Sequence, residues 1–347
     1  MSGVQIQTVS ADDADQRLDR WFRRLFPHIG QGRIEKMCRK GDLRVDGGRV
    51  KASTRLLEGQ SVRIPPLPEP GEMPARTQSR VSDADARMMR DAVIYKDDHI
   101  IAINKPPGLP SQGGSKQTRH VDGLAEALRF DLDEKPRLVH RLDKDTSGVL
   151  LLARTRSAAA AMTAAMRHRE TRKIYWAVVA GVPTPYLGEI KYALVKAPGH
   201  GAKGEGEKMI CLHPRDVDKT PGAKRAITQY ATLYRVASRA AWVAMEPITG
   251  RTHQLRAHMA EIGHPIIGDG KYGGSGQENM GDGWGAQLGG VISNKLHLHA
   301  RTMAFEHPVT RKPVVITADL PDHMTHTFDT LGWTPDLAAD DPFEAMP

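Results

Sequence analysis

Cysteine and long apolar runs are the features that this chain has least of. Its two cysteines, Cys38 and Cys211, lie in different parts of the sequence, which argues against a disulfide framework and against a thiolate metal site. No stretch approaches the roughly 18 apolar residues that a membrane span needs. The first residues include Asp12, Asp13 and Asp15, where a secretory leader would need an apolar run. We therefore expect a cytoplasmic protein with no membrane partner.

The length and the charge of the chain indicate its general class. It has 347 residues, 39% of them hydrophobic, and a formal net charge of +8 at pH 7. That length is too great for one small core and predicts two domains of a soluble globular protein. A basic balance favours a polyanionic partner, of which nucleic acid is the commonest. Because many basic proteins bind no nucleic acid, the charge alone does not identify the partner.

A proline-rich, polar stretch separates the two predicted domains. It opens at residues 65–71 and resists packing into either neighbour, so we predict a linker over residues 66–90. Residues 1–65 form a small α/β module, because apolar residues recur at helical spacing from Leu18 to Leu25 and a second short helix is expected near 34–39. The turn at 45–49 should join two short strands.

The sequence after the linker predicts a larger α+β domain over residues 91–335, followed by a tail over 336–347. Residues 92–95 and 99–104 read as a hairpin, 124–128 as a helix, and 149–153, 175–179 and 242–245 as further strands. This pattern is typical of a mixed, largely antiparallel sheet with flanking helices. Residues 197–208 and 273–290, rich in glycine or lysine, should be loops that either close on a ligand or are plain surface insertions.

Asp143 is the most informative candidate for chemistry. It lies in a polar loop directly before the apolar run at 149–153, and Arg141 is beside it. A carboxylate on a loop held between ordered elements can be aimed accurately, and a neighbouring arginine can bind phosphate and keep the acid ionised. A charged turn before a core strand would have the same residues, so this loop alone leaves both interpretations open.

Several segments together resemble one enzyme family. Residues 140–148, HRLDKDTSG, resemble the signature loop of the RluA-type pseudouridine synthases. Residues 173–181, 247–258 and 263–273 resemble further motifs of that family in the same order, with NKPPGL at 104–109 before them and LHLHA at 296–300 after them. The resemblance spans roughly residues 90 to 320. The first 65 residues resemble the S4 RNA-binding domain.

The resemblance implies a role for each site residue. Asp143 matches the acid of the family, ahead of Asp145, which we expect to cap the loop. Arg256 matches the cation that pairs with this acid, with Arg251 as the weaker candidate. Tyr175 matches the residue that packs against the target base and serves as the general base, although a core aromatic would look the same. The implied substrate-binding residues are Arg141, Arg251, His140 and Lys105, and on the S4-like module Arg33, Lys36, Arg39, Lys40 and Arg44.

A metal or cofactor site is not expected. His253 and His258 are five residues apart on a predicted helix over 252–259, which rotates one about 140° from the other. His297 and His299 lie in the expected strand region, but no carboxylate or cysteine is placed in sequence to complete a site. The turn at 105–108 lacks the spacing of a phosphate-binding loop and is better interpreted as rigid backbone that shapes the pocket.

The predicted reaction is the isomerisation of uridine to pseudouridine in RNA. It breaks the bond from ribose C1′ to base N1 and forms one to C5, and one ionised carboxylate suffices to start it; the sequence does not choose between attack at C1′, attack at C6 and proton removal. We expect 23S ribosomal RNA or its large-subunit precursor as partner, as for the RluC and RluD groups, and a monomer. The alternatives are an N-glycosidase that uses Asp143 with Asp145, and an RNA-binding assembly protein.

Overall fold

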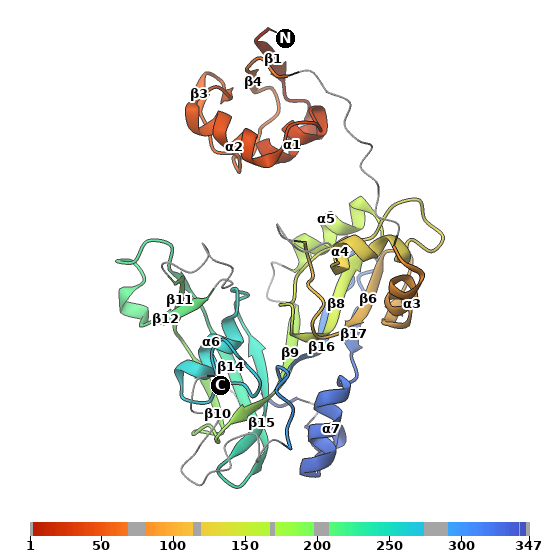
Figure 1. Ribbon diagram of the computed structural model, residues 1–347, viewed down its shortest axis with the longest axis vertical. Helices are drawn as coiled ribbons and strands as arrows, with labels where there is room; N and C mark the ends of the chain where they lie inside the picture. The colour runs from red at the N-terminus through yellow and green to blue at the C-terminus, as the bar shows by residue number, and fades with distance from the viewer. Residues whose placement is uncertain are drawn as a thin grey trace. The chain divides into compact units, whose positions relative to one another are not determined.

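The structure is a computed structural model that describes residues 3–68, 81–113, 119–166, 171–197, 208–273, 291–339 and 341–344. The chain divides into two compact units, Met1–Arg80 and Val81–Pro347, which are described separately (Figure 1). The two glycine-rich or lysine-rich segments predicted as loops, 197–208 and 273–290, lie almost wholly outside the described residues. Among the helices of the described residues, none has the length and apolar character needed to cross a membrane.

The N-terminal unit is a four-stranded antiparallel sheet with two helices. Its strands, in the order in which they pair, are β1 (Gln5–Thr8), β4 (Ser61–Ile64), β2 (Arg44–Val45) and β3 (Gly48–Arg49). Its helices are α1 (Leu18–Leu25) and α2 (Gln31–Lys40). Leu18, Trp21, Phe22 and Ile34 form its buried core. The helices and the turn between short strands that the sequence predicts are therefore confirmed.

The described part of the predicted linker is more ordered than expected. Leu67 is buried in the core of the N-terminal unit. At the other end, helix α3 (Asp83–Asp91) begins after Ser82, whose side chain accepts a hydrogen bond from the Asp85 N–H. Since Met89 of this helix is fully buried in the second unit, the linker prediction is wrong for residues 83–90. An N-capping serine before a helical run was the signal that this prediction overlooked.

The C-terminal unit contains a ten-stranded sheet. Eight strands follow the order β10-β14-β15-β9-β16-β8-β6-β5, while β17 pairs with β16 and β7 with β8. The strands are β5 (Val93–Lys96), β6 (Ile100–Lys105), β7 (Arg137–Leu138), β8 (Ser147–Ala153), β9 (Arg172–Ala180), β10 (Leu187–Ile190), β14 (Thr228–Val236), β15 (Ala240–Pro247), β16 (Leu298–Glu306) and β17 (Pro313–Thr317). All pairings are antiparallel except that of β16 with β8. The α+β class and the β5–β6 hairpin are confirmed.

Helices cover both faces of the half of the sheet that contains β9 and β15. The helices of this unit besides α3 are α4 (Val121–Leu124), α5 (Arg156–Ala165), α6 (Gln254–Glu261) and α7 (Asp322–Leu331). Trp176 and Trp242 pack with Phe328 of α7, whereas the alternate residues Ala177 and Val243 pack with Leu255 of α6. Strand side chains alternate between faces, so α6 and α7 lie on opposite sides of the sheet (Figure 1). Helix α6 begins two residues later than predicted, and the predicted helix at 124–128 is a 3₁₀ turn after α4.

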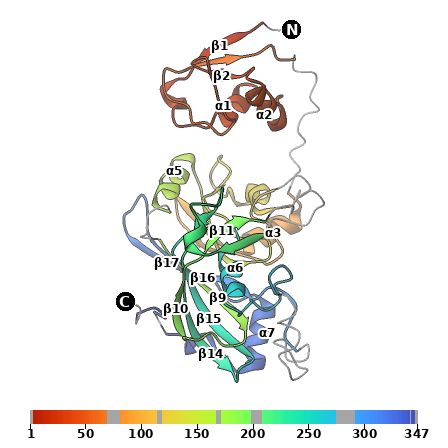
Figure 2. The ribbon, with the colours of Figure 1, turned by 90° about the vertical axis from the view of Figure 1, so that its left-hand side faces the viewer.

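A second, three-stranded sheet packs on helix α6. Its strands pair in the order β12 (Met209–Leu212), β11 (Ala193–Lys196) and β13 (Lys224–Arg225). Leu194 of β11 and Ala257 of α6 are buried together, with Cys211 packed against them. Figure 2 shows β11 in front of the large sheet, with β10, β14 and β15 extending below it.

The described part of the predicted tail is a packed segment. Residues Pro335–Leu337 form a 3₁₀ turn, Phe343 is buried in the cluster that contains Trp333, and both carboxylate oxygens of Asp341 accept hydrogen bonds from Arg172. The sequence predicts only a C-terminal tail at 336–347, and its described residues pack on the second unit. A single buried aromatic ring near a terminus carries little sequence signal, because its burial depends on a surface built elsewhere in the chain.

The strand that follows the Asp143 loop lies at the centre of the large sheet. All seven residues of β8 are buried. At its start, Gly148 (φ +107°) runs so close to β16 that a Cβ atom would lie 2.2 Å from the carbonyl oxygen of Ala300. Only glycine fits such a crossing. The close parallel contact brings β8 beside β16, which itself pairs with β9, and it therefore sets the loop before β8 near Tyr175 of β9.

Candidate active site

A cavity of about 1730 Å³ opens in the C-terminal unit between the Asp143 loop and the segment that leads into α6. Its walls include residues 110–112, residues 140–144 with Thr146, parts of β9 and β10, the adjoining ends of β14 and β15, and residues 247–256. Residues predicted for the site that line it are His140, Arg141, Asp143, Tyr175, Arg251 and Arg256. Lys105 of the predicted set does not line it.

Contacts to backbone atoms hold the Asp143 loop. The hydroxyl of Ser111 donates to the Leu142 carbonyl at 2.7 Å and accepts the Leu142 N–H at 3.0 Å. On the other side of Asp143, the Gly108 N–H donates to the carbonyl of Lys144 at 2.9 Å. Leu142 itself is buried in the core. The carboxylate of Asp143 thus projects from a peptide that is fixed on both sides.

Lys105 strengthens this loop and does not face the substrate. Its side chain is fully buried, and Nζ donates to the carbonyls of Pro106, Leu109 and Lys144 at 2.8 to 3.0 Å. Burial lowers the pKa of Lys105 to about 7, against the opposing pull of Asp145 and Asp143. The prediction that Lys105 binds substrate is wrong, because all three donors of its amine are used by the turn that shapes the pocket. These three hydrogen bonds hold the turn that the sequence interprets as rigid backbone.

His140 lies in the wall of the cavity, but it is neutral. Its Nε2 accepts the Leu151 N–H of β8 at 3.0 Å. Burial lowers the pKa of His140 to about 3, and the positive charge of Lys173 lowers it further. An imidazole without a proton on that nitrogen cannot act as a cation toward phosphate. A substrate contact of His140 would therefore not come from a positive charge, and its observed bond anchors the loop to β8.

Arg256 connects the candidate acid to a second carboxylate. Its Nη1 lies 3.3 Å from Oδ2 of Asp143, while Nε and Nη2 each donate to Asp269 at 2.7 Å. The side chain of Asp269 has no exposed surface. Burial alone would raise the pKa of Asp269, but the hydrogen bonds and charge of Arg256 outweigh it, so this pKa lies below its usual value. The fork-like pair with Asp269 holds the guanidinium rigidly toward Asp143.

Tyr175 faces the same cavity from β9. Burial raises the pKa of its hydroxyl well above the usual value, and the nearby charge of Asp143 raises it further. The hydroxyl therefore keeps its proton at neutral pH. This observation favours packing against a base over proton abstraction, because a phenolate would have to form beside a carboxylate.

His253 and Tyr272 were not predicted as active-site residues, yet both belong to the site. Nε2 of His253 lies 3.7 Å from Oδ2 of Asp143, and Nδ1 lies 3.0 Å from the hydroxyl of Tyr272. The guanidinium of Arg256 lies over the Tyr272 ring at 5.3 Å. Both residues stand inside the segments 247–258 and 263–273, which carry the family resemblance. That position was the available signal, but the histidine was considered only as a metal ligand.

Comparisons with known proteins identify the family. A model of the RNA pseudouridylate synthase family matches residues 99–261. The ribosomal large subunit pseudouridine synthase C of Vibrio vulnificus is 34% identical over 334 residues, which cover 94% of this chain and 96% of the relative. The chain belongs to the RluA-type pseudouridine synthases. The synthase is also 32% identical to the ribosomal large subunit pseudouridine synthase C of Escherichia coli K12, over 94% of this chain and 97% of the relative.

Solved structures agree with this assignment. The human RNA pseudouridylate synthase domain containing 4 superposes on the synthase with a TM-score of 0.54 and 27% identity, covering 71% of this chain and 95% of that protein. The chain is therefore an isomerase of the pseudouridine synthase class, with an α+β catalytic unit.

The predicted RNA contacts of the synthase are mostly exposed. Arg141 lies at the surface on the rim of the cavity, and Arg251 is exposed there, with Nε donating to the carbonyl of Arg225. In the N-terminal unit Arg33, Lys36, Arg39 and Lys40 are exposed on α2. Arg44 differs, because it is half-buried and its guanidinium bonds to the carbonyls of Gly41 and Gly47.

The other histidines of the predicted helix and strand, His258, His297 and His299, each contact a hydroxyl group. His258 contacts the Thr228 hydroxyl through Nδ1, and burial lowers its pKa to about 4. His297 contacts the Thr327 hydroxyl, and His299 contacts the Ser147 hydroxyl. Within the described residues no three His, Cys, Asp or Glu side chains are grouped as metal ligands would be. His253 and His258 have separate hydrogen-bond partners.

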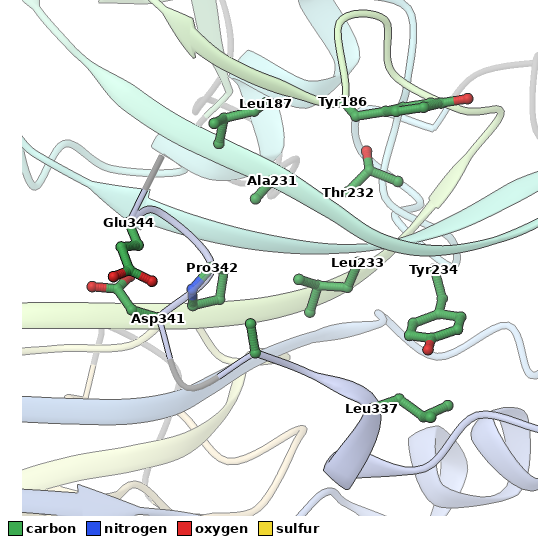
Figure 3. Close-up of a pocket in the computed structure, with 11 residues that line it drawn as sticks. Tyr186, Leu187, Ala231, Thr232, Leu233, Tyr234, Leu337, Asp341, Pro342 and Glu344 are labelled. Carbon is green, nitrogen blue, oxygen red and sulfur yellow. The ribbon is translucent and has the colours of Figure 1, made fainter. Parts of the chain in front are cut away.

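A second hollow of about 580 Å³ lies near the C-terminal segment of the synthase, away from Asp143 (Figure 3). Tyr186 and Tyr234 stand along one part of it, and Asp341 and Glu344 along another. Both oxygens of Asp341 are bound by Arg172, so this carboxylate stabilises the fold. We assign the chemistry to the larger cavity, where an acid faces a cation.

Proposed function

We propose that the synthase converts specific uridines of large-subunit ribosomal RNA to pseudouridine, with Asp143 as the acid that begins the reaction. The observation that carries this proposal is the carboxylate of Asp143 in the cavity wall, 3.3 Å from the guanidinium of Arg256. The curated relatives that match nearly the full chain are named as ribosomal large subunit synthases, which supports the choice of RNA. RNA is the proposed partner of a monomer that works in the cytoplasm.

The proposed chemistry needs no cofactor, because isomerisation leaves the oxidation state unchanged. The C1′–N1 bond breaks and the C1′–C5 bond forms, while the C5 proton leaves and N1 gains a proton. The Asp143 carboxylate starts this by attack at C1′ or C6, or by removing a ribose proton. Each route requires an ionised carboxylate, and the guanidinium of Arg256 faces this one at 3.3 Å. Tyr175 would pack against the base while it turns.

Access to the target base requires base flipping. A uridine that is paired or stacked cannot reach a carboxylate set in a cavity wall, so the nucleotide has to leave its stack. Arg141 is exposed on the loop that carries Asp143. We assign Arg141 to the space that the flipped base leaves, where its planar guanidinium stacks on neighbouring bases.

The N-glycosidase alternative receives no support from the site. That chemistry needs two carboxylates across one bond, with one of them protonated. Asp145 is exposed and does not line the cavity. Asp269, the other carboxylate near Arg256, is fully buried and paired. An RNA-binding assembly protein needs no catalytic cavity, so the site does not test this alternative. The next experiment distinguishes it from a synthase.

Deletion of the gene should remove discrete pseudouridines from 23S ribosomal RNA. We expect carbodiimide labelling and primer extension to show specific sites in wild-type cells, none at those positions in the deletion strain, and full restoration by the wild-type gene. Transfer RNA from the same cells serves as the control substrate. An unchanged ribosomal map with altered transfer RNA would contradict the proposed target, and two unchanged maps would favour the assembly-protein alternative.

The exposed face of α2 should contribute to RNA affinity and not to the chemical step. An Arg33→Gln/Arg39→Gln variant removes two charges from this face, and Arg20→Gln/Arg23→Gln removes two from α1 as the matched control. Each phosphate contact contributes about 0.7 to 0.9 to the slope of log affinity against log salt. If α2 contacts phosphate, the loss of two contacts should therefore reduce the magnitude of this slope by roughly 1.4 to 1.8 in the first variant. Filter binding of a 23S transcript across salt concentrations measures it. Equal reductions of the salt slope in both variants would mean that α2 contributes no more to RNA affinity than α1 does.

A further inference from the structure

The segment that leads into α6 places an imidazole against the candidate acid by an unusual backbone conformation. His253 has φ +52° and ψ +22°, in the left-handed region, directly before the first residue of the helix. Residues other than glycine adopt this region infrequently, and they do so mainly where the surrounding structure imposes it. The conformation directs Nε2 toward Asp143 and Nδ1 toward Tyr272.

We propose that His253 and Tyr272 are positioning residues of the synthase, in which the Tyr272 hydroxyl fixes the tautomer of His253 so that its Nε2–H faces the Asp143 carboxylate. The inference rests on the proposed role of Asp143 and extends it by naming a second group that faces the same Oδ2 atom as Arg256. Neither residue needs to touch the RNA for this purpose.

The hydrogen bonds of Tyr272 determine the direction of its proton. The Met209 N–H donates to the hydroxyl oxygen at 2.8 Å. Burial raises the pKa of Tyr272 to about 12, so the hydroxyl keeps its own proton. Because Met209 already donates to this oxygen, the hydroxyl is free to donate its proton to Nδ1 of His253, 3.0 Å away. Nδ1 then accepts, and in a neutral imidazole the proton must be on Nε2.

The charges around His253 support the same tautomer. Burial lowers the pKa of His253; Asp143 and Asp269 oppose this effect, while Arg256 and Lys271 add to it, and the net pKa lies below the usual value. The ring is therefore neutral at pH 7. The opposite tautomer would point the Nε2 lone pair at a carboxylate oxygen 3.7 Å away, which is unfavourable. With the proton on Nε2, the N–H dipole attracts that oxygen.

The same tyrosine connects the acid to the three-stranded sheet. Met209 is the first residue of β12, and Tyr272 and Cys211 pack in one cluster with Ala257 of α6. The Arg256 guanidinium lies over the Tyr272 ring. Tyr272 thus contacts both groups that face Asp143, one through its hydroxyl and one through its ring. Asp143 faces two nitrogen groups, from Arg256 of α6 and from His253 directly before α6, and a displacement of either one would misalign the carboxylate.

The inference is tested with full-length variants at single turnover, using a 23S transcript that carries tritium at uridine C5. His253→Ala should slow tritium release roughly 10- to 100-fold, the scale of a misplaced reactive group. Tyr272→Phe keeps the ring on Arg256, deletes one neutral hydrogen bond, and should cost about five-fold. His253→Gln, whose amide can donate to Asp143, should recover most of the His253→Ala loss. The dissociation constant for the transcript should stay within about two-fold, since the proposed role gives neither side chain a contact with RNA.

A double variant distinguishes positioning from general disruption. If Tyr272 acts through His253, Tyr272→Phe should have no further effect in the His253→Ala background. Independent, multiplying losses would overturn the inference, as would wild-type rates in the single variants. If His253→Ala fails to fold by circular dichroism, Tyr272→Phe and His253→Gln decide the question. An active Asp143→Asn protein would instead contradict the proposed function, whereas an inactive one with wild-type His253→Ala rates would contradict this inference alone.

Discussion

Replacing Asp143 by asparagine should abolish pseudouridine formation while the protein stays folded and binds RNA. The amide has the size of the carboxylate but is neither a useful nucleophile nor a base, so we expect the rate to fall by roughly 10³-fold or more. The fold should survive, because the loop is held through backbone atoms by Ser111 and Gly108 rather than through the Asp143 side chain. Loss of the charge opposite Arg256 leaves that guanidinium paired with Asp269.

Tritium release from a 23S transcript labelled at uridine C5 measures this loss, with filter binding to show that RNA is still retained. Asp145→Asn is the matched control, since Asp145 is two residues away in the same loop, exposed and outside the cavity wall. We expect the control to release tritium within about three-fold of wild type, as substitution of an exposed surface side chain usually has a small effect. Retained activity in Asp143→Asn, or equal loss in both variants, would contradict the assignment of the acid.

Replacing Arg256 by leucine should damage both stability and activity. The substitution leaves the buried carboxylate of Asp269 without its two hydrogen bonds at 2.7 Å. Breaking a buried ion pair by removing one partner costs about 3 to 5 kcal/mol in the free energy of unfolding. The variant also removes the cation that faces Asp143 at 3.3 Å, so tritium release should be lost even at temperatures where the variant remains folded.

A second substitution separates these two effects. Arg256→Leu/Asp269→Asn removes the uncompensated charge, and the asparagine side-chain oxygen can still accept the N–H groups of Lys271 and Tyr272 that Asp269 accepts. We expect urea unfolding to show that the double variant regains much of the lost stability, while its activity stays absent. Recovery of activity together with stability would mean that Arg256 serves only the fold.

The stability loss of Arg256→Leu should shrink at low pH. Arg256 depresses the pKa of Asp269 in the folded protein, so the pair contributes stability that is fully present above the unfolded aspartate pKa of about 3.9. That contribution declines as the pH falls through the depressed value. In the variant, burial without the cation favours the protonated form of Asp269, which carries no buried charge, so the variant recovers stability at a higher pH than the one at which the wild type loses it. The two unfolding free energies should therefore differ more at pH 7 than at pH 4, and a constant difference would argue against a charge effect.

Local patterns were sufficient to predict much of the fold. The helices near Leu18 and Ile34, the β5–β6 hairpin and the strand after Asp143 all follow from apolar spacing and turn residues over a few positions. Asp143 and Arg256, separated by more than a hundred residues, were paired through the family resemblance, and the structure places them together. Residues 83–90 were assigned to a linker because their polar composition outweighed the signal of one capping serine. The C-terminal segment was predicted only as a tail because one buried aromatic ring adds little to a polar sequence.

Lys105 and His140 show that residue type alone does not predict which atoms a side chain contacts. Both occur in motifs beside the acid, and both can bind phosphate when exposed. The fold buries the Lys105 amine among three carbonyl groups and gives the His140 nitrogen a backbone N–H. Whether such a side chain faces the cavity or the core depends on the closing of the 105–109 turn over the loop before β8, and no local spacing encodes that closure.

The sequence by itself determined the loop that carries Asp143 and the strand that follows, because these depend on residues adjacent along the chain. The family resemblance marked Asp143 as the candidate acid. Tertiary structure decided the surroundings of the acid. Asp269 behind Arg256, and Tyr272 behind His253, became neighbours of Asp143 only through the packing of α6 against β9 and β15. The physical reason is that a carboxylate needs its cation and donors within a few ångströms. In this protein those groups come from segments whose proximity is set by long-range strand pairing.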